Sequence, residues 1–283
     1  MVNPLYFNGR KVLIATKHQK ESVIGPALKN AFGLEYIISE GLDTDVLGTF
    51  TGEIERTKSP MEAARQKCNL GMDLCGVDLA VGSEGSFGPH PDLLFVPAGE
   101  EIMVFKDRKN DLEISAKMVT QQTNYSSITL TPDTNLDAFL SHARFPSHGL
   151  ILKKGAHDHS LMDKGIHDES QLKKRIKEYL DLHGSCYLET DMRAMHNPTR
   201  MRAIAELTER LIQKINHCCP YCHTPGFDIT DAIHGLPCAI CNMPTRSIKN
   251  FIYTCKKCNF TQLESNRENK KEEDPMFCDF CNP

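Results

Sequence analysis

The strongest constraint on the fold of this chain is a set of four Cys-x-x-Cys pairs, all placed after residue 218. They are Cys219/Cys222, Cys238/Cys241, Cys255/Cys258 and Cys278/Cys281. Each pair can present two thiolates to one tetrahedral ion, and two pairs complete a four-thiolate site. In a chain without a recognisable export signal, this spacing favours zinc over disulfides. We therefore predict two structural Zn²⁺ ions held by these eight cysteines.

The spacing leaves the pairing of the four turns open. The stretch from Cys238 to Cys258 has the length of a compact zinc ribbon, in which a short hairpin separates two turns. That favours a nested arrangement, in which the outer turns at Cys219/Cys222 and Cys278/Cys281 share the other ion. Sequential pairing along the chain is the alternative. Either way, we expect residues 217–283 to form a small zinc-ribbon-like module that depends on metal, because it has few large apolar residues for a core.

Residues 1–216 alternate short apolar runs with amphipathic segments, which is typical of an α/β domain. We predict strands at 11–16, 34–41, 77–85, 149–154 and 186–192 and a hairpin over 100–119. We predict helices at 20–33, 59–76, 133–143, 169–184 and 197–215. Gly33 is a typical stop signal, and Ser59-Pro60 and Asn197-Pro198 are typical starts. The expected fold is a mixed, mostly parallel sheet with flanking helices, followed by the zinc module.

Charge and hydropathy narrow the function classes. The net charge of the chain is −4, which gives no general attraction to nucleic acid or anionic membranes. No stretch approaches 18 consecutive apolar residues, and we expect a cytoplasmic protein without a membrane partner. The zinc module carries seven Lys or Arg against eight Asp or Glu, so nucleic-acid binding is not favoured there. Self-association into a homo-oligomer stays open.

The stretch "AVGSEGSFGPHP" (80–91) raises the central functional question, because Glu84 stands between two glycines where a strand is expected to end. Ligands of open α/β sheets bind beyond the carboxyl ends of the strands. The start of the helix after the first strand, the loop 40–56 and the turn 189–201 could meet Glu84 there. Lysines and arginines in these stretches suit phosphate, and carboxylates suit Mg²⁺. The candidate substrate-binding residues are Lys17, Lys20, Ser83, Ser86, His90, Arg193, Asn197 and Arg200.

Three motifs in the first third of the chain resemble the inosine/xanthosine triphosphate pyrophosphatase superfamily. They are "IATK" after the first strand, Glu62-x-Ala64-x-x-Lys67 in a helix, and "AVGSEGS" after the third strand. His18 departs from that family, which has an asparagine there. The resemblance covers about residues 11–90 and implies that Lys17 or Lys20 contacts phosphate. It also implies that Glu62 and Glu84 serve Mg²⁺ and the attacking water.

The motifs "SEGSFGPHP" (83–91) and "ETDMRAMHNPTRM" (189–201) resemble an uncharacterised bacterial family with a C-terminal zinc module. That resemblance covers nearly the whole chain and implies no activity.

We expect a Mg²⁺-dependent hydrolase that acts on a nucleotide or related phosphoanhydride. One alternative is a protein that binds and senses a nucleotide without turnover. Another is a nucleic-acid-binding protein that uses its zinc ribbon. The segment 155–168 has the composition of a metal site, with three histidines and three aspartates, but no fixed spacing, and we predict a solvated loop.

Overall fold

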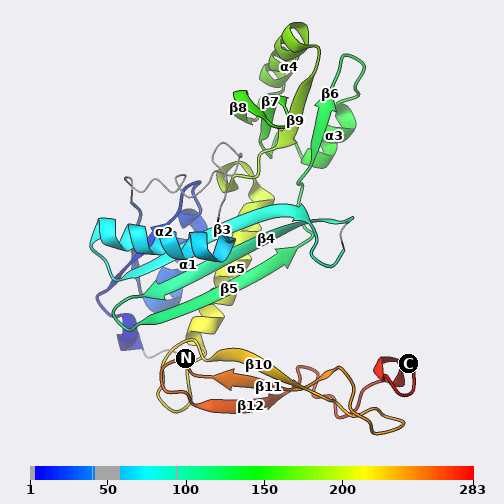
Figure 1. The fold of residues 1–283 in the computed structure, drawn as a ribbon. Helices are drawn as coiled ribbons and strands as arrows, with labels where there is room; N and C mark the ends of the chain where they lie inside the picture. Colours follow the sequence, from blue (N-terminus) through cyan, green and yellow to red (C-terminus); the bar gives the residue numbers. More distant parts are fainter. Residues whose placement is uncertain (1–3, 40, 42–57, 94) are drawn as a thin grey trace. The chain divides into compact units, whose positions relative to one another are not determined.

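The computed structural model describes residues 4–39, 41, 58–93 and 95–283, and it divides into two compact units. One unit is formed by residues 7–212. The other is formed by residues 213–283 together with the described N-terminal residues 4–6. Each unit has its own sheets (Figure 1).

The larger unit contains a five-stranded sheet with the order β2-β1-β3-β4-β5. Its strands are β1 (Lys11–Ala15), β2 (Glu35–Ile37), β3 (Leu79–Pro89), β4 (Pro97–Asp107) and β5 (Leu112–Thr120). Strand β1 runs parallel to β2 and β3, over three residue pairs each. The β3–β4 and β4–β5 pairings are antiparallel and much longer. The predicted mixed sheet is therefore confirmed, but the prediction that it is mostly parallel is wrong, because β3, β4 and β5 follow one another through short hairpin connections.

The helices α1 (Glu21–Phe32), α2 (Pro60–Cys75) and α5 (Pro198–Asn216) begin and end close to the predicted residues. Helix α1 stops at Gly33, whose left-handed φ of 69° suits glycine. Helix α2 begins with a capping box between Ser59 and Glu62, and Pro60 occupies its first turn. At the start of α5, the Asn197 side chain accepts a hydrogen bond from the backbone N–H of Arg200.

Helix α2 packs on one face of the sheet, where apolar side chains of α2, β1, β3 and β4 form a buried cluster. This cluster consists of Leu13, Ala15, Ala64, Cys68, Met72, Ala80 and Val104. Residues alternate between faces along a strand. The side chains of Ser83, Phe87 and their cross-strand neighbours on β4 therefore lie on the opposite face, where the Thr208 hydroxyl of α5 contacts the Met103 sulfur.

Residues 121–197, between β5 and α5, contain a separate four-stranded antiparallel sheet of order β6-β9-β7-β8. Its elements are β6 (Ser127–Leu130), α3 (Asp137–Ala143), β7 (Leu150–Gly155), β8 (Asp158–Ile166), α4 (Glu169–His183) and β9 (Cys186–Thr190). Helices α3 and α4 pack on one face of this sheet through an apolar core that includes Phe139, Leu172 and Tyr179. The prediction of a solvated loop over 155–168 is wrong, because most of this segment is β8, hydrogen-bonded to β7.

The smaller unit contains an antiparallel sheet of β10 (Asp228–His234), β11 (Ile248–Thr254) and β12 (Thr261–Ser265), in sequential order. The predicted hairpin between Cys238 and Cys258 is wrong, because a single strand, β11, joins these two turns.

Short 3-10 helices lie at Pro4–Phe7, Ala194–His196 and Pro275–Phe277. In the part of the chain that the structure describes, no helix combines the length and apolar character needed to cross a membrane.

Gly82 allows α2 to pack directly against β3, and this gives a testable stability effect. A Cβ atom at residue 82 would lie 2.4 Å from the carbonyl oxygen of Ala64 and 2.9 Å from the sulfur of Cys68. Backbone atoms of a helix cannot yield cheaply, so we expect Gly82→Ala to lower the free energy of unfolding by about 1–3 kcal/mol. Urea denaturation followed by circular dichroism measures this.

Gly88 provides the matched control, because it lies on the same strand and nothing lies within 4 Å of a Cβ placed there. Gly88→Ala should leave the stability unchanged or raise it by up to about 1 kcal/mol. Equal effects of the two substitutions would contradict the proposed packing role of Gly82.

Candidate functional site

Glu84 lies inside strand β3 and not in a loop that follows it. Strand β3 continues past Gly82, Glu84 and Gly85 and pairs with β4 as far as Pro89. The expectation that the strand ends in a glycine loop is therefore wrong. Sequence alone could not separate the two cases, because glycine serves both turns and places where another element approaches a strand closely.

A buried ion pair lies on the face of β3 that packs against α2 at Gly82. The close approach of α2 at Gly82 brings Lys67 of that helix against the carboxylate of Glu84, and the two groups form a salt bridge. Both residues are at most 9% exposed. Removing one partner of a buried pair costs about 3–5 kcal/mol, because the remaining charge stays desolvated.

A second buried ion pair lies on the opposite face of β3, at Gly85. Arg200 of α5 donates from Nε to Glu101 Oε1 at 2.6 Å and from Nη2 to Oε2 at 3.3 Å. Its Nη1 donates to the Met192 carbonyl at 2.5 Å, and its guanidinium lies over the Phe87 ring. A Cβ at Gly85 would lie 2.4 Å from Arg200 Nη2, so only glycine leaves room for this pair on the strand.

Lys20 precedes both ion pairs in the sequence but lies close enough to both to interact with them electrostatically. It is the N-cap residue of α1, at the end of the short connection that follows β1, and it is 4% exposed. Its ammonium donates to the Ser83 hydroxyl at 3.1 Å and to the Ser83 carbonyl at 3.4 Å. The last residue of β1 that pairs with β3 is Ala15, opposite Gly82. Lys20 therefore occupies the edge of β3 that opens where β1 ends.

The ammonium of Lys20 has no carboxylate within 4 Å among the residues that the structure describes. Burial, together with the smaller effect of the neighbouring Arg200, lowers the pKa of Lys20 to about 7. Glu101 and Glu84 act in the opposite direction, but from a greater distance than an ion pair. A buried amine without an ion-pair partner either loses its proton or accepts an anion. We call Lys20, Lys67, Glu84, Glu101 and Arg200 the buried charge cluster.

Other predicted site residues lie outside this cluster or have structural partners. The Glu62 carboxylate accepts hydrogen bonds from the Ser59 backbone and hydroxyl, where it caps α2. The ring Nδ1 of His90 accepts a hydrogen bond from the Asp92 backbone. Ser86 follows Gly85 on β3, and Lys17 is half-buried in the β1–α1 connection. Their proposed contacts with substrate remain predictions.

Arg193 and Asn197 order the turn before α5. Arg193 forms a bidentate ion pair with Asp191, whose side chain is fully buried. The Asn197 amide donates to the Asn124 side chain at 2.8 Å, which joins the two ends of the 121–197 insertion. The structure thus brings Lys20, Ser83, Glu84 and Arg200 to one region, whereas the charge of Arg193 is matched by Asp191.

Glu101 and Lys67 belong to the cluster, although neither is among the site residues that the sequence predicts. For Glu101 the sequence held a signal, because it shares strand parity with the buried Met103 and Phe105. A carboxylate on the inward face of a strand needs a partner. The predicted contribution of the acidic loop 40–56 falls mainly on residues 42–56, which lie outside the described part of the chain.

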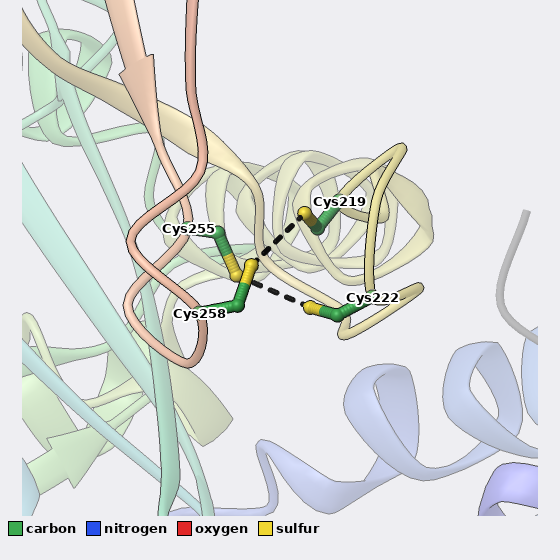
Figure 2. A group of neighbouring side chains, drawn as sticks. All are labelled: Cys219, Cys222, Cys255 and Cys258. Atoms are coloured by element: carbon green, nitrogen blue, oxygen red, sulfur yellow. Dashed lines mark hydrogen bonds between the residues drawn. The ribbon is translucent and has the colours of Figure 1, made fainter.

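The eight cysteines form two four-cysteine clusters, consistent with two structural zinc ions. One consists of Cys219, Cys222, Cys255 and Cys258, whose side chains converge in Figure 2. Its Sγ atoms approach to 3.7 Å (Cys219–Cys258) and 3.5 Å (Cys222–Cys255). Four thiolates at about 2.3 Å from a tetrahedral Zn²⁺ lie roughly 3.8 Å apart. The geometry therefore suits that ion.

The second cluster consists of Cys238, Cys241, Cys278 and Cys281. The pairing is thus crossed, first turn with third and second with fourth, and both the nested and the sequential predictions are wrong. The antiparallel sheet explains this result. Asp228 at the start of β10 pairs with Thr254 at the end of β11, so the first and third turns share one end of the sheet. The second and fourth turns follow β10 and β12, which both finish at the other end.

All four turns have the same backbone hydrogen bond. The fifth residue of each turn donates its N–H to the carbonyl of the first cysteine, at 2.8–3.0 Å; these residues are His223, Asn242, Asn259 and Asn282. Three of them have left-handed φ values of about 60°: His223, Asn242 and Asn259. Asparagine and histidine tolerate that conformation better than most residues. The local sequence of each turn therefore contributes to its shape.

A family model described as a domain of unknown function, DUF6671, matches residues 67–283. The chain belongs to the DUF6671 family. The match begins at Lys67 in α2, so the family region contains four of the five residues of the buried charge cluster and both cysteine clusters. Lys20 lies before it.

Among solved structures, the chain is similar to the crystal structure of protein VC0702 from Vibrio cholerae. The two share 14% sequence identity and a TM-score of 0.29, over 39% of this chain and 62% of that one. The similarity spans less than two thirds of VC0702. No curated protein matches the chain.

The crossed pairing predicts the zinc content of cysteine variants. Serine at all four positions of the first and third turns, Cys219, Cys222, Cys255 and Cys258, should leave one zinc per chain. Serine at Cys219, Cys222, Cys278 and Cys281 should leave none, because each cluster then keeps only two thiolates. Elemental analysis of the purified chains measures the ratio.

Cys218→Ser is the control for these variants, because Cys218 precedes the first turn but belongs to neither cluster. It should keep two zinc ions. One zinc retained in the second quadruple variant and none in the first would favour nested pairing and contradict the structure.

Proposed function

We propose that the protein hydrolyses a phosphoanhydride of a nucleotide or related small molecule at the buried charge cluster. The observation that carries this proposal is Lys20, a buried amine that donates only to Ser83 and has no carboxylate partner among the described residues. A phosphate oxygen is the kind of acceptor that would complete its hydrogen bonds and balance its charge.

The position of the cluster supports the proposal. Lys20 follows β1 at the first turn of α1, and Ser83 lies on β3 just beyond the end of the β1–β3 pairing. Carboxyl ends of parallel strands and helix N-termini are common places for phosphate groups. The resemblance of residues 11–90 to the inosine/xanthosine triphosphate pyrophosphatase superfamily points to the same chemistry.

Each residue of the cluster has a role in this proposal. Lys20 binds a phosphate oxygen, while Arg200 adds positive potential from its fixed place beside Glu101. Glu84 orients the attacking water, and Lys67 holds its carboxylate in place. Mg²⁺ would neutralise the phosphates; because both carboxylates of the cluster already pair with cations, it would arrive largely on the substrate.

Binding without turnover is the second candidate, and the same pairing of carboxylates favours it. Glu84 and Glu101 each contact a cation, Lys67 and Arg200 respectively, so either carboxylate must exchange that contact before it serves as a base or a metal ligand. A protein that senses a nucleotide needs only the anion site around Lys20. We do not extend the proposal to nucleic acid, because the zinc module has no surplus of basic residues.

The hydrolase proposal is tested with the full chain and a panel of nucleoside triphosphates, with Mg²⁺ or with EDTA. We expect release of phosphate or pyrophosphate from at least one of them. Lys20→Met should reduce kcat/KM by on the order of 100-fold, because it removes a positive charge that stabilises the phosphoryl group during transfer. Glu84→Gln should reduce kcat more than it changes KM.

Lys29→Met is the matched control, because Lys29 lies on the same helix but is exposed and pairs with Glu35. It should leave kcat/KM unchanged. Thermal stabilisation by a triphosphate without any turnover would favour the sensing protein. Absence of both turnover and stabilisation would contradict the two candidates together.

A further inference from the structure

A second pocket lies on the sheet of the 121–197 insertion, away from its helices. Helices α3 and α4 cover one face of this sheet, through Leu150, Leu152 and Leu188 among others. The alternate residues Ile151, Lys153, Tyr187 and Glu189 line a pocket of about 280 Å³ on the other face. Ligand sites in proteins are usually concave, with aromatic walls and a few fixed polar groups.

The lining of the pocket includes an ion pair whose lysine is buried. Lys153 of β7 lies directly opposite Tyr187 of β9, and its ammonium is 2.7 Å from Glu189 Oε1. The Lys153 side chain is 4% exposed and that of Glu189 is 22% exposed. Burying such a pair is costly, and hydrophobic residues would stabilise the sheet at least as well. The pair therefore suggests recognition of a ligand that needs a donor and an acceptor side by side.

The walls of the pocket hold aromatic rings and an unsatisfied ring nitrogen. Tyr125 and Tyr187 both line it. Within the described ranges, His159 Nδ1 is the one buried side-chain nitrogen or oxygen atom that has no hydrogen-bond partner, and His159 also lines the pocket. Buried polar atoms are nearly always satisfied, so an unsatisfied one beside a pocket points to a ligand or water there.

We propose that this pocket binds a heteroaromatic base of nucleoside size, stacked against a tyrosine ring. An N–H of the base donates to Glu189, and the neighbouring carbonyl or ring nitrogen accepts from Lys153. Carboxylates and lysines are the usual partners of such base edges, and tyrosine rings the usual stacking surfaces. This inference goes beyond the proposed function and does not rest on it, because no residue of the buried charge cluster lines the pocket.

The test uses the full chain and the free nucleosides guanosine, inosine, adenosine, cytidine and uridine, which carry no phosphate. Binding is followed by saturation-transfer NMR and by tyrosine fluorescence, which is usable because the chain has no tryptophan. We expect at least one nucleoside to bind. The double variant Lys153→Met/Glu189→Gln, which removes both charges together, should weaken that binding at least tenfold.

Two further variants separate recognition from folding. Tyr187→Phe should keep the affinity and Tyr187→Leu should lose it, because only the first retains a ring for stacking. Lys154→Met is the matched control, since Lys154 is the exposed neighbour of Lys153 and pairs with Asp158. Variants are compared only where their thermal unfolding matches that of the parent chain.

The proposal is overturned if none of the five nucleosides binds, or if the double variant binds as tightly as the parent chain. Equal losses in Lys154→Met would also overturn it. Failure of the phosphoanhydride proposal would not produce these results, because nucleosides offer no phosphate to Lys20.

Discussion

Two missing Cβ atoms on one strand decide how the larger unit is assembled. At Gly82 the backbone of α2 comes so close to β3 that any side chain would collide with it, and at Gly85 the Arg200–Glu101 pair fills the space of a side chain. Between these glycines, the Ser83 hydroxyl accepts a hydrogen bond from the ammonium of Lys20 at the start of α1. Three helices that are distant in the sequence thus bring charged groups to four consecutive residues of a single strand.

The consequence is a concentration of charge in a place that water hardly reaches. Two of the three cations in the buried charge cluster pair with carboxylates, whereas Lys20 has no such partner in the described part of the chain. Desolvation and the nearby Arg200 then lower the pKa of Lys20 to about 7. Perturbed groups of this kind gather at functional sites because ligand binding or catalysis compensates for their cost.

The sequence predicts local structure well where a residue acts on its own segment, as at the ends of helices. Ser59-Pro60, Gly33 and Asn197-Pro198 mark helix ends that the structure confirms. Prediction from the sequence fails where a residue's partners are distant in the chain. The glycines in β3 resemble a turn because the local sequence does not show that α2 and Arg200 pack against them. The spacing of the eight cysteines predicts two groups of four, but their pairing follows from the three-stranded sheet, which the spacing alone does not reveal.

The central claim is that Lys20 is an anion site, and its own titration tests this most directly. Lysine Nζ resonances of the full chain can be followed with pH by NMR, and Lys20 is assigned by its absence in Lys20→Met. Our account predicts a pKa of about 7 without ligand, instead of the ordinary 10.5, and a clear rise when pyrophosphate binds. A pKa near 10.5 in the free protein, or one that pyrophosphate leaves unchanged, would contradict it.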